Sequence, residues 1–494
     1  MSFKGGYIAR LCASCVAILA LAGCAPLDML RVPQGAAVTD VPHAIDMPAS
    51  WPETLLASDG LASAPATSQT QVHWWRHLGD AQLDGLIEAA LITAPDLRSA
   101  RARLRQSRAG RDLAVAGLYP SLDASLAVNR ARSGNASPQT FYAAGFDAGW
   151  EPSVFGGQRD AVAGAEADFA ATAALFEAAH ASLAAEVALN YVNLRTFQRR
   201  LAIARENVRS QAETLQLVEW RTTAGLASLL DVEQARANLE SSRATLPGLD
   251  SGAAATAHHL AVLTGLAPGG LREMLAVATP LPNPPEHIAV GIPADTLRQR
   301  PDVRAAEFVL RAELARTAQR EADRYPSLRL SGSLGWQAAS TAALGRGGSA
   351  AQALAASLAM TLFDGGRIRA RIEVQDAVRE QALVAYEKSI LGALEDVENA
   401  LADYAAGRAR VAARRKAATA AGNAARLAQN LYAAGSIDFQ KVLDSERTRL
   451  SAEDGLASAE ADVLTAVIRL YKALGGGWQI EGSETDKTQT EKSS

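Results

Sequence analysis

The sequence predicts a mixed α and β fold made of two similar halves, each with a pair of strands and a long helical hairpin. Three observations predict it: two long runs lack proline, four landmarks recur in the same order, and apolar residues recur every seven positions. No proline occurs from Ser153 to Leu246 or from Ser327 to Ser494. Because proline breaks helix interiors and central strands, these runs can hold very long uninterrupted elements.

The N-terminus has the pattern of an export signal. A short basic region precedes the apolar stretch Leu11–Ala22, which is too short to anchor stably across a bilayer. The stretch ends in Leu21-Ala22-Gly23-Cys24, which resembles the lipobox of bacterial lipoproteins, where the cysteine thiol is acylated. We therefore expect residues 1–23 to be a lipoprotein signal peptide and Cys24 to carry a diacylglycerol and an N-acyl chain. By the same resemblance, Ala25 after the cysteine favours sorting to the outer membrane.

Composition excludes some functions and sets the tails apart. The formal net charge of -4 argues against nucleic-acid binding, which usually needs a basic surface. Residues 24–72 are rich in Pro, Ala, Ser and Thr without a sustained period, so we expect a lipidated, extended tail. Residues 479–494 are acidic and rich in Ser and Thr, which predicts disorder.

An internal repeat organises the rest of the chain. From Pro95 to Leu122, 12 of 28 residues are identical to those 206 positions later. The landmarks shared by the two halves are Pro95-Asp96 and Pro301-Asp302, Tyr119-Pro120 and Tyr325-Pro326, Phe155-Gly156 and Phe363-Asp364-Gly365, and Ala224-Gly225 and Ala434-Gly435. Their offsets drift only from 206 to 210, which indicates duplication. We assign repeat 1 to residues 73–266, repeat 2 to residues 294–478, and a Pro-rich equatorial linker to residues 267–293, within a cluster of prolines from Pro247 to Pro301.

Each repeat has the same predicted order of elements. In repeat 1, a helix from Pro95 to about Gly117 precedes strands within about 119–152 and a helical hairpin over about 158–265. In repeat 2, the strands fall within about 325–363 and the hairpin within about 366–475. Apolar and polar residues alternate in the strands, as in Leu328 to Trp336, which predicts hairpins with one apolar face.

The helical hairpins carry a heptad pattern. Apolar residues recur every seven positions at Val187, Leu194, Leu201, Val208 and Leu215. At ~1.5 Å per residue the first long helix would extend about 95 Å. A sustained period of seven indicates a left-handed supercoil and therefore coiled-coil partners.

These elements together predict a membrane barrel that several chains share. No segment after the signal has 18 consecutive apolar residues, so no transmembrane helix is expected. Four strands cannot close into a barrel, since the smallest bacterial barrels need about eight, and an open sheet edge is forbidden in lipid. Three copies would supply twelve strands, four from each protomer, continuous with a long coiled-coil α-helical barrel.

The ordered landmarks resemble those of the TolC-like outer-membrane efflux proteins, in their lipoprotein (NodT-type) branch. The resemblance covers about residues 74 to 478 and includes Trp74-Trp75, the segment Ala224–Val232, and Tyr432-Ala433-Ala434-Gly435. It implies a homotrimer in the outer membrane of a Gram-negative bacterium, with its helical part in the periplasm. The trimer would be the exit duct of a tripartite pump with a periplasmic adaptor and an inner-membrane transporter of the resistance-nodulation-division class.

The resemblance also implies a gate at the periplasmic helix turns. By family position, Asp231 would hydrogen-bond Tyr432 as a latch, and Asp444 would belong to an acidic ring in the lumen. The position where some members add a latch arginine is Ile437 here, so that contact must be absent or replaced. The residues implied to contact the adaptor are Gly225, Leu226, Ser228, Gly435 and Ser436.

The sequence contains no recognisable catalytic, metal-binding or cofactor-binding constellation, and we therefore predict that the protein is not an enzyme. Its glycine-rich segments lack the Lys-Ser/Thr of a phosphate loop. Two alternatives remain at this point: the outer-membrane channel of a type I protein secretion system, and a structural coiled-coil lipoprotein without a pore. The cargo is left open.

Overall fold

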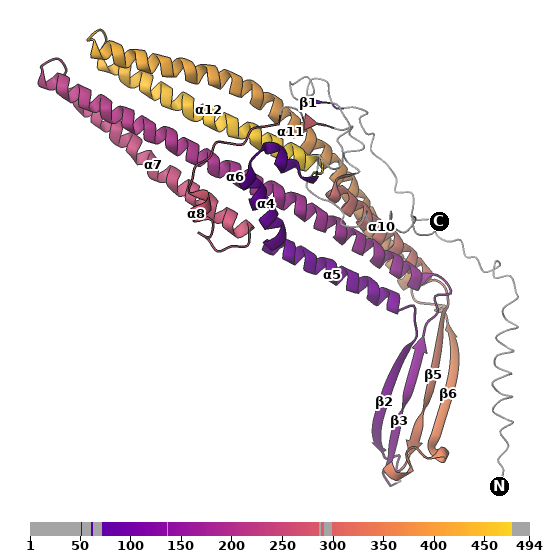
Figure 1. Cartoon of the computed structure of the whole chain (residues 1–494). Coiled ribbons are helices and arrows are strands. Elements are labelled where there is room, and N and C mark those ends of the chain that lie inside the picture. Colours follow the sequence, from indigo (N-terminus) through magenta and orange to yellow (C-terminus); the bar gives the residue numbers. More distant parts are fainter. Residues whose placement is uncertain are drawn as a thin grey trace, which may run out of the picture. The chain divides into compact units, whose positions relative to one another are not determined.

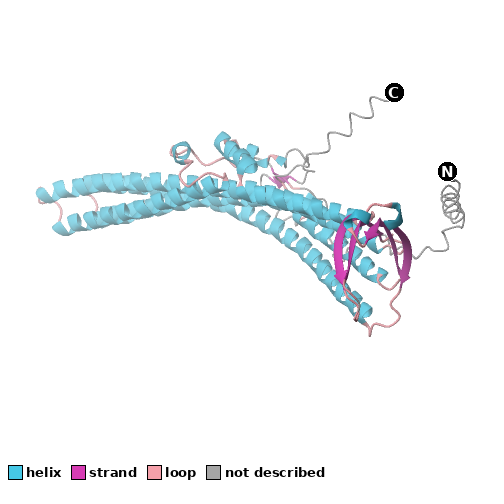
Figure 2. Cartoon of the chain, turned by 90° about the horizontal axis from the view of Figure 1, so that it is seen from below, coloured by secondary structure: helices cyan, strands magenta, loops and turns pink. Residues whose placement is uncertain are grey.

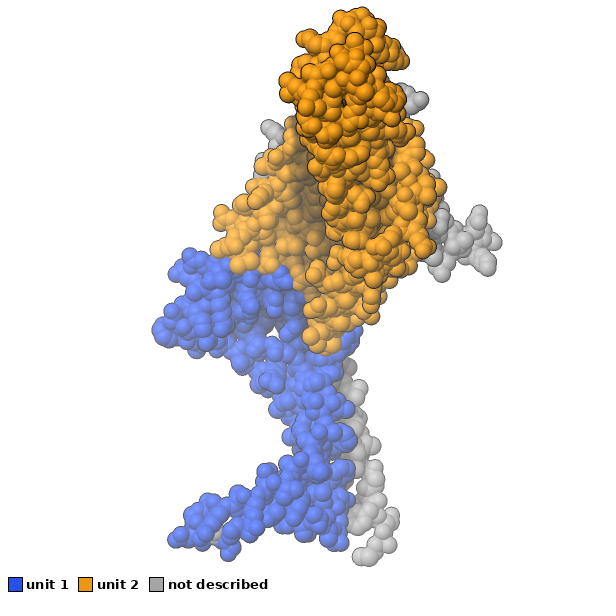
Figure 3. Space-filling model, turned by 90° about the vertical axis from the view of Figure 1, so that its left-hand side faces the viewer, with its two compact units in different colours: residues 1–42, 117–161, 314–375 blue, residues 43–116, 162–313, 376–494 orange. Residues whose placement is uncertain are grey.

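The computed structural model describes residues 51, 61–62, 72–135, 137–285, 288–290 and 299–476. These residues belong to two compact units, coloured separately in Figure 3. The first unit contains residues 117–161 and 314–375, and the second contains residues 43–116, 162–313 and 376–494. The signal peptide, Cys24, most of the N-terminal tail and the tail from 479 onward lie outside the described residues.

The first unit is built on a four-stranded antiparallel sheet in the order β2-β3-β5-β6 (Figure 1). The strands are β2 (Ser121–Ala131), β3 (Gln139–Trp150), β5 (Ser327–Ala338) and β6 (Ala350–Ala359). Each half of the sequence supplies one hairpin, and β3 pairs with β5 across the boundary between the halves. Among the described residues, β2 and β6 each pair on one side only.

The strand register sorts the side chains by polarity. Successive side chains alternate between the two faces of a strand, so cross-strand partners share a face. One face carries apolar side chains that are half or more exposed, including Leu126, Leu334 and Leu354. The opposite face carries polar and small residues such as Asp123, Asp147 and Ser333. The sheet therefore has the one apolar face that the alternation predicts.

The second unit is mainly helical, and Figure 2 shows that most of the described chain is helix. Its two halves have helices of equal length. The 22-residue helices are α5 (Pro95–Ala116) and α10 (Pro301–Ala322), the 67-residue helices are α6 (Gly157–Thr223) and α11 (Arg367–Ala433), and the 35-residue helices are α7 (Leu229–Leu263) and α12 (Phe439–Ala473). The shorter elements of this unit are β1 (Leu61–Ala62), which pairs in parallel with β4 (Ile288–Ala289), α4 (Ala81–Thr93), α8 (Arg272–Leu275) and the 3-10 helix η3 (Trp74–Leu78). The 3-10 helices η4 (Thr341–Ala343) and η5 (Gly347–Ser349) belong to the first unit and lie between β5 and β6.

Not one of the helices in the described residues is both apolar and long enough to span a lipid bilayer.

Ion pairs fix the side-by-side order of the helices in the second unit. Glu460 of α12 pairs with Arg199 of α6 and with Arg415 of α11, both at 3.0 Å, so α12 lies between α6 and α11. On the other side of α6, Arg111 of α5 lies over the Phe169 ring of α6 at 5.2 Å (Figure 1). The order across the unit is therefore α5 and α7, then α6, then α10 and α12, then α11.

The main core follows the heptad pattern. Val187 and Leu194 of α6 are buried and pack in one cluster with Leu401 of α11 and Leu464 of α12. Trp74 belongs to the same cluster and stacks on Tyr471 at 5.4 Å between ring centroids. These contacts anchor the segment before α4 to the helical core.

Pro247 is the first proline of the mid-chain cluster and also falls within the range of about 158–265 predicted for the first helical hairpin. It lies inside α7, so it does not mark the linker. Its position is exposed, where the lost hydrogen bond to residue 243 can be made to water and the ring has room. Pro247 therefore belongs to the helical hairpin.

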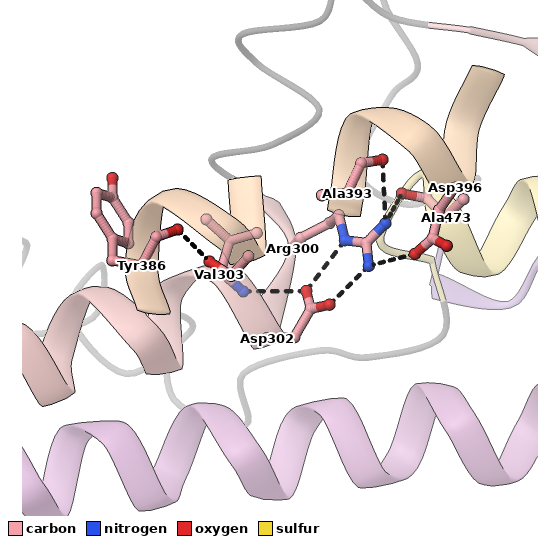
Figure 4. A network of polar contacts seen from close by, with 8 residues as sticks. Arg300, Asp302, Val303, Tyr386, Ala393, Asp396 and Ala473 are labelled. Carbon is pink, nitrogen blue, oxygen red and sulfur yellow. Dashed lines mark hydrogen bonds and ion pairs between the residues drawn. The ribbon is translucent and has the colours of Figure 1, made fainter. Parts of the chain in front are cut away.

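A buried arginine ties the start of α10, the middle of α11 and the end of α12 together (Figure 4). Arg300 donates to the carbonyls of Ala393 in α11 and Ala473 in α12, and its guanidinium pairs with Asp302 at 2.6 Å and Asp396 at 3.0 Å. Burial on its own raises the pKa of the Asp302 carboxyl, but the hydrogen bond and charge of Arg300 outweigh it and lower that pKa below its usual value.

The close packing of strands β3 and β5 can be tested at Gly335. Gly335 faces Gly145 across β3 and β5, and a Cβ at Gly335 would lie 2.6 Å from the Ala144 carbonyl oxygen. We expect Gly335→Ala to lower the thermal midpoint and folded yield, because the strands must move apart. Gly332→Ala is the control, since its Cβ would have its nearest neighbour at 3.7 Å. Equal stability of the two variants would contradict the assigned register.

The ion pair between Arg300 and Asp302 can be tested by varying the pH. Because its pKa is lowered by folding, the contribution of Asp302 is present above its unfolded pKa of about 3.9 and is lost as the pH falls through the lower folded pKa. We expect Asp302→Asn to lower the thermal midpoint near pH 6 and to make progressively less difference below pH 4. The control is Asp96→Asn, its counterpart in the first half. A difference that persists unchanged at low pH would contradict the electrostatic account.

Candidate gate at the helical hairpin turns

The two hairpin turns have the same backbone design. In the first turn Gly225 has φ +73°, and in the second Gly435 has φ +77°, a left-handed conformation that glycine adopts without strain. Leu226 N–H donates to the Arg221 carbonyl at 2.7 Å, and Ser436 N–H donates to the Leu431 carbonyl at 2.8 Å. The glycine N–H groups also donate to backbone carbonyls, each three residues earlier in the chain. Together these hydrogen bonds form the Schellman motif that ends a helix.

Each returning helix begins with a side-chain cap. Ser228 and Asp231 form a capping box at the start of α7: Asp231 N–H donates to the Ser228 hydroxyl at 3.1 Å, and Ser228 N–H donates to the Asp231 carboxylate at 3.0 Å. In α12, the Asp438 carboxylate accepts from the Lys441 N–H. Glycine followed by a capping residue therefore explains why the chain reverses at these two points.

The ends of the two hairpins pack together through a small apolar cluster of their own. Its buried members are Val218, Val232, Ala235, Tyr432, Phe439, Val442 and Leu443, and Ile437 packs against them. Ile437 therefore makes an apolar contact at this end of the hairpins and cannot supply a charged latch.

Arg221 is a functional candidate that the sequence reasoning missed. Its Nη1 donates to the carbonyls of Tyr432 at 2.9 Å and Ala433 at 3.1 Å. Its guanidinium carbon lies 4.8 Å from the centroid of the Tyr432 ring. Arg221 of the first hairpin thus holds the end of α11 in the second hairpin. The available signal was an arginine four residues before the Gly225 landmark.

The three predicted gate residues lie in different settings. Tyr432 is 4% exposed, and its hydroxyl has no hydrogen-bond partner among the described residues. Burial raises the pKa of Tyr432, the charge of Arg221 opposes the rise, and the charge of Asp231 adds to it. The Asp231 carboxylate takes part in the capping box, and Asp444 is exposed on α12, where it accepts from Gln440. The structure thus places Asp231 within electrostatic range of Tyr432 and sets Asp444 apart from both.

A polar layer lies between the hairpins next to the apolar cluster. The Glu446 side chain is fully buried and accepts from Thr214 Oγ1 at 3.0 Å and from Gln429 Nε2 at 2.7 Å. Its second oxygen and the Asn238 amide nitrogen lack partners among the described residues. An incompletely satisfied layer stabilises packing less than an apolar one, so the hairpin ends are joined more weakly than the main core.

The outer surface of the first turn is apolar. Leu226, Leu229 and Leu230 are each about two-thirds exposed, at 67%, 69% and 65%, and Trp220 is 63% exposed. Of the residues expected to contact an adaptor, Gly225, Leu226, Ser228, Gly435 and Ser436 all lie on or beside the two turns. Contiguous exposed apolar side chains of this kind mark a surface that binds another protein.

A sheet with one apolar face, joined in sequence to long helical hairpins that end in paired turns, defines the subunit of an outer-membrane channel. The comparison with protein families agrees. The chain belongs to the outer membrane efflux protein family, whose model matches residues 86–266 and 292–476. This family consists of channels, which are not enzymes.

Curated relatives cover nearly the whole chain. The pyoverdine export outer membrane protein OpmQ of Pseudomonas putida is 32% identical, over 85% of this chain and 92% of its own length. The toluene efflux pump outer membrane protein TtgF of Pseudomonas putida is 28% identical, over 88% and 92%. Nodulation protein T of Rhizobium leguminosarum is 29% identical, over 88% and 93%. The predicted resemblance to the NodT-type efflux proteins is therefore confirmed.

Solved structures share the fold. The outer-membrane channel OprN superposes with a TM-score of 0.82 at 32% identity, over 90% of this chain and all of that one. CusC, whose structures concern transmembrane channel formation, superposes with a TM-score of 0.75 at 25% identity, over 88% of this chain and 99% of that one.

Arg221 can be tested by local exchange. Arg221→Ala removes two charged hydrogen bonds and a cation–π contact, together about 2 kcal/mol. We expect amides near the end of α11, around residues 428–435, to exchange with solvent about 30-fold faster in hydrogen-exchange mass spectrometry. The control is Arg236→Ala, because Arg236 makes only exposed ion pairs with Glu233 and Glu219. Identical exchange in both variants would remove Arg221 from the gate.

Proposed function

We propose that three copies of this chain form the exit duct of a tripartite efflux pump, which passively conducts small molecules from an inner-membrane transporter and a periplasmic adaptor to the exterior. The observation that carries the proposal is the four-stranded sheet with an exposed apolar face. In lipid, every strand edge needs a partner, and four strands are too few to close. Three copies supply twelve strands and satisfy both edges. A coiled-coil scaffold without a pore has no use for such a sheet.

The polarity of the two sheet faces supports the same arrangement. The face with Leu126, Leu334 and Leu354 suits contact with acyl chains, whereas the face with Asp123, Asp147 and Arg329 suits water. Closing the sheet with the polar face inward gives an aqueous lumen, and the long helices would continue it as a periplasmic helical barrel.

The hairpin turns are the proposed contact with the adaptor. The exposed leucines at 226, 229 and 230 offer an apolar surface, and the backbone of Gly225 and Gly435 lets a partner approach closely. The inner-membrane transporter in this proposal is of the resistance-nodulation-division class, by analogy with the family.

The gate combines the predicted latch with Arg221. Within the described residues the buried Tyr432 hydroxyl donates to no acceptor, and the charge of the Asp231 carboxylate contributes to raising its pKa. A change of side-chain rotamer would let Asp231 leave the Ser228 cap and accept from Tyr432, a charge-assisted bond that would hold the turns closed. Asp444, repeated three times in the trimer, would form an acidic ring that favours cations.

The anchor and the cargo complete the proposal. Acylation of Cys24 would add a lipid anchor to the outer membrane. The relatives are named for pyoverdine export, toluene efflux and cation efflux, three unlike cargoes. A passive duct with such varied relatives conducts what its transporter delivers, so the transporter would set the cargo.

Single-channel recording in a planar bilayer tests the duct and its latch. We expect the wild type to show a small conductance, and Asp231→Ala combined with Tyr432→Phe to raise it several-fold because the turns are no longer held closed. Asp250→Ala, which removes an exposed carboxylate from the same helix, is the control and should match the wild type. No conductance from any variant would overturn the duct, whereas equal conductance from all three would overturn the latch alone.

A further inference from the structure

The helices of the two halves of the chain can be aligned residue by residue in the sequence. Helix α10 begins 206 positions after α5, and α11 begins 210 positions after α6, in each case with identical lengths. Arg304 of α10 therefore corresponds to Arg98 of α5, and Glu387 of α11 corresponds to Glu177 of α6.

The halves meet within the chain where α6 lies beside α10 and α12. At this junction Arg304 Nη1 donates to Glu177 Oε2 at 2.8 Å. Both side chains are mostly shielded, with exposures of 26% and 16%, so the pair is more strongly coupled than a surface ion pair. Burial raises the pKa of Glu177 and the charge of Arg304 opposes the rise, as is typical of a carboxylate held in an interface.

The counterparts of this ion pair stand at the two outer helices of the layer. Helix α5 borders one side, α11 borders the other, and neither Arg98 nor Glu387 has an ion-pair partner within the described part of the chain. Arg98 is exposed on α5, near Pro95 and Ser99, which are also exposed.

We propose that Arg98 of one copy pairs with Glu387 of the neighbouring copy, and that this ion pair repeats between protomers the Arg304–Glu177 contact within each chain. Head-to-tail contact of unlike surfaces closes into a ring, as the proposed trimer requires. The inference rests on the proposed trimeric duct and names the residues that join its protomers.

The same register sets a second pair beside the first. Arg105 lies seven residues after Arg98, and Glu380 lies seven residues before Glu387, on helices that run in opposite directions. Seven residues advance each helix by about 10.5 Å, so both pairs match at once. Heptad-spaced charges are a known device for setting partner and orientation in coiled coils. Arg105 and Glu380 are both exposed.

The differences between the halves fit an edge role. Where α10 has Glu307, which pairs with Arg311, α5 has Arg101, so Arg105 has no such partner within its own helix. Where α11 has Glu380, α6 has Ala170. The outer helices thus differ from their interior counterparts in two positions: Glu380 replaces Ala170, and Arg101 replaces the Glu307 that pairs with Arg311.

Cross-linking tests the proposal in the full-length protein in membranes. We combine Arg98→Cys with Glu387→Cys and treat the membranes with a short bismaleimide, because an arginine–glutamate contact holds the Cα atoms too far apart for a disulfide. We expect a covalent trimer on denaturing gels. Each single variant is expected to give no cross-link above that of the wild type. The matched control, Arg304→Cys with Glu177→Cys, should react within one chain and run as a monomer.

A charge exchange gives a second, independent measurement. Arg98→Glu and Glu387→Arg should each lower the temperature at which the detergent-solubilised trimer dissociates, and the combined variant should recover at least half of the loss. Three copies by light scattering without the covalent trimer, or without recovery, would overturn the pairing and leave the duct standing. A single copy of the wild type by light scattering would overturn both.

Discussion

Backbone hydrogen bonding at the two sheet edges is the constraint on which the rest of the structure depends. Strands β2 and β6 each present unpaired N–H and C=O groups along one side, beside a face of leucine, valine and aromatic side chains. In a membrane such groups cost several kcal/mol each unless another strand satisfies them. In the proposed duct, copies of the chain satisfy these edges by pairing with one another.

In the helical unit, contacts between chains would be made by side chains rather than by backbone hydrogen bonds. Each half supplies one long helix and two shorter ones, and the halves join through α6 against α10 and α12. In the proposed trimer, the two similar halves give the chain two kinds of junction, one inside the protomer and one between protomers. The outer helices α5 and α11 differ from α10 and α6 in two charges there, Arg101 in place of Glu307 and Glu380 in place of Ala170. Arginine suits such a contact because its planar, permanently charged group forms directed hydrogen bonds.

The sequence predicted the fold well because its strongest signals were periodic. The proline-free runs and the heptad from Val187 to Leu215 predicted long helices, and the landmarks at Gly225 and Gly435 predicted their turns. Pro247 was counted with the linker prolines although it falls within the predicted hairpin, because tolerance of proline depends on whether its side of the helix is exposed, which no local pattern states. Arg221 was missed for a related reason: its partners, Tyr432 and Ala433, lie more than 200 residues away and are backbone carbonyls, which leave no mark in a sequence. The register of Gly335 against Gly145 likewise needed coordinates.

The central claim is that three chains close their sheets into one barrel. Electron cryomicroscopy of the purified protein in lipid nanodiscs tests it most directly, because the strands can be counted in a section through the membrane. The account predicts a closed ring of twelve strands with threefold symmetry, in which β6 of each copy pairs with β2 of the next. A sheet that stays open, or a ring with any other number of strands, would contradict it.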